Sequence, residues 1–141
     1  LFNIERAFQN MKGRKWTKLY WAIDLHDTVI TGKYNKFNVG AEVYPGVLEM
    51  FDWFAKRHAD MVPILYTSSH PEAIKRLMRD ELWPRGIEFA YINENPECPS
   101  NDMCNFEGKF YFNILLDDKA GFDGTTDWFN IRNELVRLGE W

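Results

Sequence analysis

The stretch that decides the fold is KLYWAIDLHDTV, residues 18–29. Its first half is a mainly apolar run that stops abruptly at Asp24. Short runs of this kind are typical of strands that are buried on both faces of a sheet. The sequence therefore predicts a buried strand over residues 18–23, with Asp24 at the point where the strand meets a loop.

Two later runs end in the same way. Residues 61–66, MVPILY, are followed by Thr67, and residues 111–116, YFNILL, are followed by Asp117 and Asp118. Both runs predict buried strands that stop at polar side chains. A further strand is expected over residues 87–92.

Helices are expected between and after these strands. The first begins after Pro45-Gly46, ends near Lys56-Arg57-His58 and has one apolar face, formed by Val47, Met50, Phe51 and Phe54. The second begins near Pro71, which is acceptable in a first turn, and reaches about Leu82. Ser69 and Glu72 are spaced as a capping box at its start. A last helix is expected over residues 128–138, capped by Asp127 or by the threonines before it.

The alternation of strands and helices predicts an α/β fold: a three-layer α/β/α, Rossmann-like domain with a mainly parallel sheet covered on both faces. Residues 31–44 are expected to form a loop or a small hairpin, and residues 93–108 a polar loop. In an open sheet of this kind the carboxyl ends of the strands share one edge, where ligands bind. Asp24, Thr67 and the pair Asp117-Asp118 are therefore expected to meet.

The composition narrows the class of protein. A chain of 141 residues, 45% apolar and 27% charged, is expected to form a single globular domain. A formal charge of −4 argues against nucleic-acid or membrane binding driven by net charge. No apolar run approaches the ~20 residues that span a bilayer, and residues 1–6 lack the order of a signal peptide. Cys98 and Cys104 are expected to be free thiols in a cytoplasmic protein.

The shared edge would crowd Asp24, Asp27, Asp117 and Asp118 together. Carboxylates this close resist joint ionisation unless a cation neutralises them, and Mg²⁺ prefers oxygen ligands. With the charge neutralised, an Asp can attack a phosphoryl group and form an aspartyl-phosphate. Hydroxyl and ammonium groups for the phosphoryl oxygens are available nearby in Thr67, Ser68 and Lys109.

The motifs also resemble those of the haloacid dehalogenase (HAD) superfamily. Residues 23–29 are similar to its first motif, an apolar strand followed by Asp-x-Asp-x-Thr, and Leu65-Tyr66-Thr67 is similar to the second. Lys109 is similar to the Lys of the third motif, and residues 113–118 are similar to the fourth, a strand that ends in paired acids. The order is that of the family, and the resemblance spans roughly residues 18–122.

The resemblance implies roles for these residues. Asp24 would be the nucleophile and a magnesium ligand, and residue 26 would act as general acid and base and bind the metal through its backbone carbonyl. Thr67 and Lys109 would hold the phosphoryl group, with Lys75 as a rival for the lysine role. Asp117 or Asp118 would complete the metal site.

His26 departs from the phosphatase pattern, because it stands where the second Asp belongs. Thr28 fixes the register, so Asp27 comes one place too late. Histidine is a competent acid and base near neutral pH, and Asp27 could replace it after a small loop shift. Three functions remain open: a Mg²⁺-dependent phosphohydrolase, a weak or inactive binding or scaffolding protein with the same fold, and a different reaction from the same nucleophile.

The spacing of the motifs bears on the substrate. The intervals from Asp24 to Thr67 and from Thr67 to Lys109 are filled by expected scaffold elements, which leaves no room for a large cap. Capless members of the superfamily often accept large substrates, such as phosphoproteins or nucleic-acid ends. A phosphorylated substrate is therefore the expected partner, with nucleic acid only as a substrate. Near the site, a loop carries two lysines and two aromatic rings, Lys33, Tyr34, Lys36 and Phe37.

Overall fold

The computed structural model describes residues 4–31 and 42–141. Its elements are, in chain order, α1 (Glu5–Gly13), β1 (Leu19–Asp24), α2 (Val47–Lys56), β2 (Met61–Tyr66), α3 (Pro71–Leu77), the π-helix η1 (Met78–Leu82), the 3₁₀-helix η2 (Trp83–Arg85), β3 (Tyr91–Ile92), β4 (Ile114–Leu116), the 3₁₀-helix η3 (Asp118–Ala120) and α4 (Asp127–Arg137). The chain thus has the mixed α/β composition that the sequence predicts.

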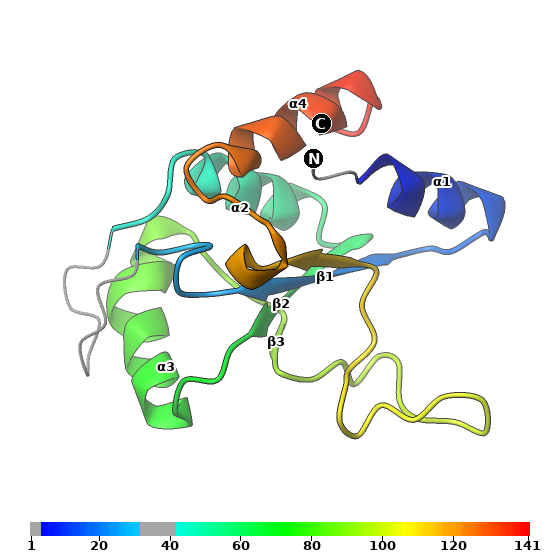
Figure 1. The fold of residues 1–141 in the computed structure, drawn as a ribbon, viewed down its shortest axis with the longest axis horizontal. Helices are drawn as coiled ribbons and strands as arrows, with labels where there is room; N and C mark the ends of the chain where they lie inside the picture. Colours follow the sequence, from blue (N-terminus) through cyan, green and yellow to red (C-terminus); the bar gives the residue numbers. More distant parts are fainter. Residues whose placement is uncertain (1–3, 32–41) are drawn as a thin grey trace.

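The four strands form one parallel sheet in the order β3-β2-β1-β4, with β1 near its centre (Figure 1). Asp24 lies opposite Tyr66 of β2, and Ile23 lies opposite Leu116 of β4. The chain steps outward from β1 to β2 and β3, and then returns to the other side of β1 for β4. The strand order therefore reverses between β1 and β4, which is where open α/β sheets bind ligands.

Both faces of β1 are buried. Leu19, Trp21 and Ile23 belong to the larger of two apolar clusters, and Tyr20 and Ala22 belong to the smaller one. Successive side chains of a strand point to opposite faces, so the two clusters lie on opposite faces of the sheet. Double burial explains why the run is continuously apolar rather than alternating.

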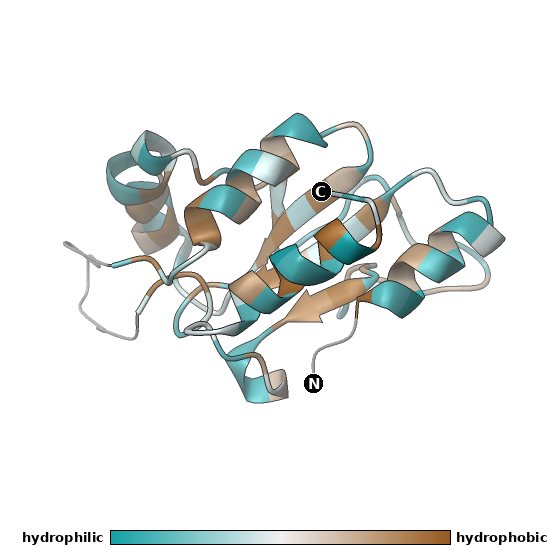
Figure 2. Cartoon of the chain, turned by 90° about the horizontal axis from the view of Figure 1, so that it is seen from above, coloured by the Kyte–Doolittle hydropathy of each residue, from teal (hydrophilic) through white to brown (hydrophobic). Residues whose placement is uncertain are grey.

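The helices cover the face of the larger cluster. Every buried side chain of the four α-helices belongs to that cluster. Figure 1 shows α1, α2 and α4 on one side of the sheet, and in Figure 2 the strands beneath them are mostly hydrophobic. In the described part of the chain, the other face is covered by Phe110 and its neighbours Cys98, Tyr111 and Phe112. The second face of the sheet is therefore covered by the loop segment that precedes β4.

α1 is not among the helices predicted from the sequence, and β3 and β4 are shorter than predicted. Ile4 and Phe8 are buried at the start of the chain, one turn apart on one face of α1. β3 is only two residues long. The carbonyl of Pro63 accepts a hydrogen bond from Ala90 N at 2.8 Å, on the side of β2 that faces β3. Proline has no N–H, so Pro63 donates no hydrogen bond to β3. β4 begins at Ile114, because Tyr20 N donates to the side chain of Asn113 at 2.8 Å instead of to a strand carbonyl.

The predicted capping box at Ser69 is wrong, whereas the N-cap of α4 is one of the predicted threonines. The N-cap of α3 is His70, without a side-chain hydrogen bond, and Ser69 instead donates its N–H to Thr67 Oγ1 at 3.2 Å. Thr126 is the N-cap of α4, also without one, and Asp127 accepts from Asp123 N at 2.7 Å. Within the described residues, no helix has the length and apolarity needed to cross a membrane.

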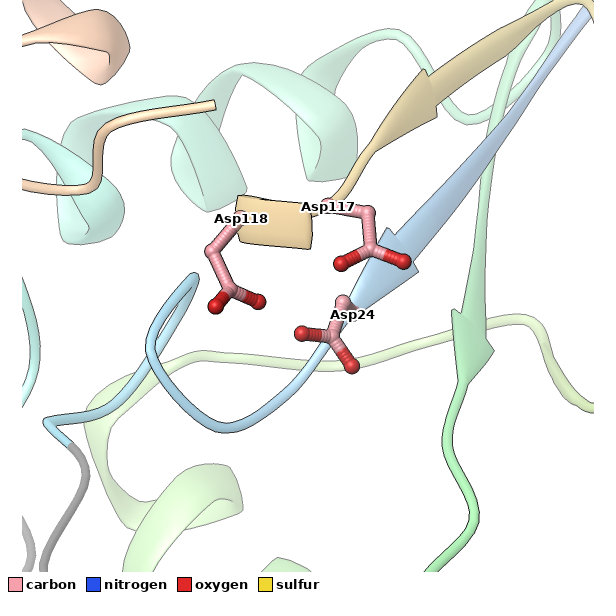
Figure 3. Close-up of side chains that lie close together, drawn as sticks. All are labelled: Asp24, Asp117 and Asp118. Carbon is pink, nitrogen blue, oxygen red and sulfur yellow. The ribbon is translucent and has the colours of Figure 1, made fainter. Parts of the chain in front are cut away.

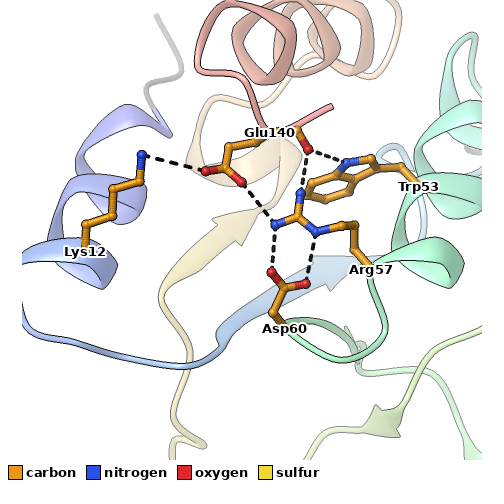
Figure 4. A network of polar contacts seen from close by, with 5 residues as sticks. All are labelled: Lys12, Trp53, Arg57, Asp60 and Glu140. Carbon is orange, nitrogen blue, oxygen red and sulfur yellow. Dashed lines mark hydrogen bonds and ion pairs between the residues drawn. The ribbon is translucent and has the colours of Figure 1, made fainter.

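A polar network fixes the last residues of the chain to the end of α2 (Figure 4). Arg57 donates to both carboxylate oxygens of Asp60 at 3.0 and 2.7 Å, and to the backbone oxygen of Glu140 at 2.6 Å. Trp53 Nε1 donates to the same oxygen at 2.9 Å, and the Trp141 ring stacks on the Trp53 ring with centroids 6.2 Å apart. One guanidinium thus holds two distant segments together.

We expect Arg57→Met to lower the free energy of unfolding by about 1–3 kcal/mol, because it leaves half-buried carboxylate and carbonyl groups without their donor. Urea denaturation at pH 7 measures the change. Arg79→Met is the matched control: Arg79 is exposed and pairs with the adjacent, exposed Asp80, so its loss should change stability little. Equal effects of the two substitutions would contradict the role given to Arg57.

Candidate functional site

Three carboxylates meet at the carboxyl edge of the sheet (Figure 3). Asp24 is the last residue of β1, and Asp117 and Asp118 directly follow β4, the hydrogen-bonded neighbour of β1. One oxygen of each carboxylate lies within 4.8 Å of the others. Because β1 and β4 are parallel neighbours, their carboxyl ends bring together residues far apart in sequence. Asp24 and Asp117 thus lie at one edge of the sheet, as the sequence predicts.

The cluster is electrostatically unfavourable without a cation. The pKa of Asp24 is raised to about 7, first by burial, then by a hydrogen bond with the Asp118 side chain and by the negative charge of Asp117. The N–H of Leu25 and the hydroxyl of Thr28 act in the opposite direction. Asp24 therefore retains a proton at a pH where a free aspartate is ionised. A hard divalent cation would replace that proton, so the donor set fits Mg²⁺.

Thr28 ties the site to the core. Its hydroxyl donates to Asp24 Oδ2 at 3.2 Å and accepts from Asp118 N at 3.2 Å. Its carbonyl accepts from Trp128 Nε1 of α4 at 2.8 Å, in a buried hydrogen bond. Thr28 is fully buried. A single side chain therefore bridges the end of β1 and the chain after β4.

The loop after Asp24 turns tightly. Asp27 has a φ of +63°, and Val29 N donates to Leu25 O at 2.9 Å. The loop then pairs with the chain before α2, where Tyr44 N donates to Val29 O at 3.0 Å and Ile30 forms an antiparallel bridge with Val43. The ends of the expected hairpin are thus paired, while Lys33, Tyr34, Lys36 and Phe37 lie outside the described residues.

Tyr44 packs beside the acidic cluster. Its pKa is raised by burial and by the negative charges of Asp27, Asp118 and Asp123. A Cβ on Gly124 would lie 2.8 Å from the Tyr44 ring, so the ring needs a glycine at that position. Asp27 therefore contributes negative charge to the same region as Asp118.

Thr67 is held at the neighbouring strand end by Asn93. Thr67 N donates to Asn93 Oδ1, and Asn93 Nδ2 donates to Thr67 O, both at 2.8 Å. Asn93 has a φ of +54°, a region that Asn enters more readily than most residues, and its N–H donates to Leu65 O at 2.7 Å. Asn93 is not among the predicted site residues, because an Asn that opens a polar loop carries no distinctive signal in the sequence.

A cavity of about 770 Å³ lies along the same edge and includes Thr67, Lys109 and Asp117 in its lining. Lys109 is exposed, and its Nζ lies 5.4 Å from the centroid of the Phe112 ring. Two of the residues expected to hold the phosphoryl group, Thr67 and Lys109, thus border one space with Asp117, an expected metal ligand, whereas Asp24 and Asp118 are not part of its lining. The rival Lys75 is exposed on α3 and pairs with Glu72 at 3.7 Å.

The remaining predicted residues differ in how far they are buried. His26 and Asp27 are half-buried in the loop after Asp24, and Ser68 is exposed and is not part of the cavity lining. Cys98 and Cys104 are free thiols, as expected. In the sequence, Thr28 serves only to fix the register of the first motif. In the structure, the Thr28 hydroxyl links the Asp24 carboxylate to the backbone N–H of Asp118.

Comparisons of the chain with protein-family models, with curated proteins and with solved structures found no match. The resemblance of residues 18–122 to the HAD superfamily accordingly stays a prediction from the sequence motifs.

The raised pKa of Asp24 predicts a pH dependence of stability in the cation-free protein. The unfolded chain has a pKa near ~3.9 at this residue, and the folded protein about 7, so the folded state binds the proton more tightly. Asp24 therefore contributes stability below pH ~4 that is lost as pH rises to about 7. Asp24→Asn removes this loss, so the free energy of unfolding of the variant minus that of wild type should rise over this range and then level off.

Urea denaturation in EDTA between pH 4 and 8 measures that difference. Asp52→Asn is the control, because Asp52 lies on the exposed face of α2 and pairs with the exposed Lys56. A difference for Asp24→Asn that does not change with pH would contradict the assigned pKa.

Thr28→Val should raise the pKa of Asp24 further, because the variant loses the hydroxyl that favours the ionised carboxylate. It should also lower the free energy of unfolding by about 1–2 kcal/mol, since Asp118 N loses its acceptor. Carboxyl ¹³C NMR titration and urea denaturation measure the two effects. Thr28→Ser keeps the hydroxyl and should restore the pKa. If Thr28→Val leaves the pKa where it is in wild type, the hydroxyl does not position Asp24.

Proposed function

We propose that this protein is a Mg²⁺-dependent phosphohydrolase that cleaves phosphomonoesters through an aspartyl-phosphate on Asp24. The observation that carries the proposal is the convergence of Asp24, Asp117 and Asp118 at the point where the strand order reverses. Thr67 and Lys109 border the adjoining cavity together with Asp117. The HAD-like motifs supply the same residues in the same order.

The magnesium ligands would be carboxylate oxygens of Asp24, Asp117 and Asp118, together with the backbone carbonyl of His26. Their proximity and the raised pKa of Asp24 support this ligand set, because a bound cation would relieve the repulsion between the carboxylates. When bound, the ion would neutralise the carboxylates and polarise the phosphoryl group. Lys119 N donates to Asp117 Oδ1 at 3.0 Å, and Asp118 shares a hydrogen bond with Asp24. Both acids therefore stay in the proposed ligand set.

The residues of the chain would divide the reaction into two steps. In the first, a carboxylate oxygen of Asp24 bonds to phosphorus, the bond from phosphorus to the alcohol oxygen breaks, and the alcohol leaves with a proton from the general acid. In the second, water attacks phosphorus and gives a proton to the same group, and the bond to Asp24 breaks to release phosphate. His26 is the proposed acid and base, and Asp27 is the competing candidate.

Thr67, Ser68 and Lys109 would hold the phosphoryl oxygens. The Thr67 hydroxyl accepts from Ser69 N, which leaves its own hydrogen to donate to an oxyanion. The two hydrogen bonds between the Asn93 side chain and the Thr67 backbone hold Thr67 in place. Lys109 supplies the positive charge from the border of the cavity.

The proposal also covers the domain architecture and the cellular compartment of the protein. The sheet would belong to a reduced Rossmann-like domain without a large cap, in which the chain over residues 93–113 stands where a three-layer α/β/α domain has its second layer of helices. The free thiols Cys98 and Cys104 support a reducing compartment, and we propose the cytoplasm.

We expect the wild-type protein with Mg²⁺ to hydrolyse p-nitrophenyl phosphate, and Asp24→Asn to lower kcat by about 10³-fold or more, because the nucleophile is lost. EDTA should abolish the activity, and added Mg²⁺ should restore it. Phosphate release measures the rate. Asp52→Asn, which changes an exposed Asp on α2, is the control and should retain wild-type activity.

A second pair of variants assigns the acid and base. One of these variants, His26→Asn or Asp27→Asn, removes the general acid and base. That variant should lower kcat by about 10²–10⁴-fold. Isothermal titration with Mg²⁺ separates the remaining outcomes. A wild-type protein that binds Mg²⁺ but hydrolyses neither p-nitrophenyl phosphate nor a phosphorylated oligonucleotide would contradict the phosphohydrolase and favour a binding or scaffolding protein.

A further inference from the structure

The cavity beside the acidic site is larger than a phosphate group requires. It has a volume of about 770 Å³, within the usual range for pockets that enclose small organic ligands. Thr67, Lys109 and Asp117 border it, so it adjoins two of the residues proposed to hold the phosphoryl group and one of the proposed magnesium ligands. The part of the cavity beyond these residues is available to the rest of a substrate.

We infer that this cavity binds the alcohol portion of the substrate, and that this portion carries a flat aromatic or heteroaromatic ring without further negative charge. The inference rests on the proposed function, which it deepens by naming the substrate class. It follows from the rings in the lining, from the sign of the charges around them and from the way the loop is held.

Aromatic side chains form a connected group in the lining. Tyr66 is 46% exposed although it ends a strand whose other residues are buried. Its ring lies 6.0 Å from the Phe110 ring, and the Phe110 ring lies 5.6 Å from the Phe112 ring. Phe106 also lines the cavity. A planar ligand could stack on such rings, and each aromatic contact adds about 0.5–1.5 kcal/mol beyond the burial of area.

The charges favour one phosphate and no other anionic group. Of the described residues in the lining, Lys109 is the one cationic side chain, and Glu94, Glu107 and Asp117 are acidic. Lys109 lies over the Phe112 ring, and in the proposed reaction it faces the phosphoryl group. An additional carboxylate or phosphate on the substrate would meet Glu94 or Glu107 without a compensating cation. A polynucleotide end, with a negative charge on every nucleotide, fits poorly.

The loop that walls the cavity is attached to the sheet, so the cavity is formed in advance. Glu97 accepts from Lys18 Nζ at 2.6 Å, from the Tyr91 hydroxyl at 2.7 Å and from the Tyr20 hydroxyl at 3.3 Å. Asn95 is buried and donates to Tyr111 O at 2.9 Å. A wall held by these contacts can select for shape without a separate cap domain.

The test compares benzyl phosphate with cyclohexylmethyl phosphate in the wild-type protein with Mg²⁺. The two alcohols have similar size and leave with similar ease, but only one contains an aromatic ring. We expect kcat/KM to be about fivefold higher for benzyl phosphate, the fold-change that corresponds to one aromatic contact. A third substrate, 4-carboxybenzyl phosphate, tests the charge and should be hydrolysed less efficiently than benzyl phosphate.

Variants at Tyr66 assign the preference to the cavity. Tyr66→Ala should bring the ratio of kcat/KM values for the benzyl and cyclohexylmethyl substrates close to one, and Tyr66→Phe should keep it. Trp83→Ala is the matched control, because Trp83 is another exposed aromatic residue, on η2, and does not line the cavity. It should keep the wild-type ratio.

A binding experiment makes the result independent of catalysis. ¹H–¹⁵N NMR titration of the Asp24→Asn protein with 2-naphthylmethanol should shift the amide signals of Phe106, Phe110 and Phe112, and the shifts should be lost in the Asp24→Asn, Tyr66→Ala double variant. If the wild-type protein hydrolyses no phosphomonoester, the proposed function fails and the titration alone decides on the ring site. Equal rates for the two substrates, with no shift at these amides, would overturn the inference and leave the proposed function standing.

Discussion

Three carboxylates that repel one another are held within one small volume, and the rest of the site depends on this constraint. The constraint comes from the sheet. Asp24 ends β1 and Asp117 follows β4, and the hydrogen bonds between the two parallel strands fix how close their carboxyl ends lie. The apolar side chains on both faces of β1 provide the burial free energy that offsets the repulsion. Functional sites commonly contain such locally unfavourable arrangements, because the same charges bind the ligand.

The core and the site share atoms through Thr28. Its carbonyl is bonded to the buried Trp128 of α4, and its hydroxyl is bonded to the Asp24 carboxylate and to the backbone of Asp118. Trp128 in turn packs against Phe122 and Phe51. A change in how α4 packs would therefore move the carboxylates, although α4 contributes none of them. The position of the acidic cluster is a property of the whole helical face.

Much of this arrangement follows from the sequence, because it depends on local patterns. The end of an apolar run marks the end of a buried strand, and parallel strands share an edge, so the meeting of Asp24 with Asp117 could be predicted without coordinates. The failures share a different cause. Pro63 shortens β3 through an N–H missing from one particular side, and Asn113 replaces a strand carbonyl with its side chain. Both effects depend on which strand the backbone groups of a residue face, and the local sequence pattern does not reveal this.

The second face of the sheet shows the same dependence on tertiary contacts. An alternating pattern predicts helices on both faces, yet the described helices place their buried side chains on one face only. The other face is covered by a polar-looking segment whose aromatic residues, such as Phe110 and Tyr111, are spaced without a helical period. In a small domain, covering one face with loop instead of helix leaves part of that loop at the carboxyl edge. The loop that covers the second face therefore also lines the cavity at the carboxyl edge, so one segment of the chain serves both the core and the proposed site.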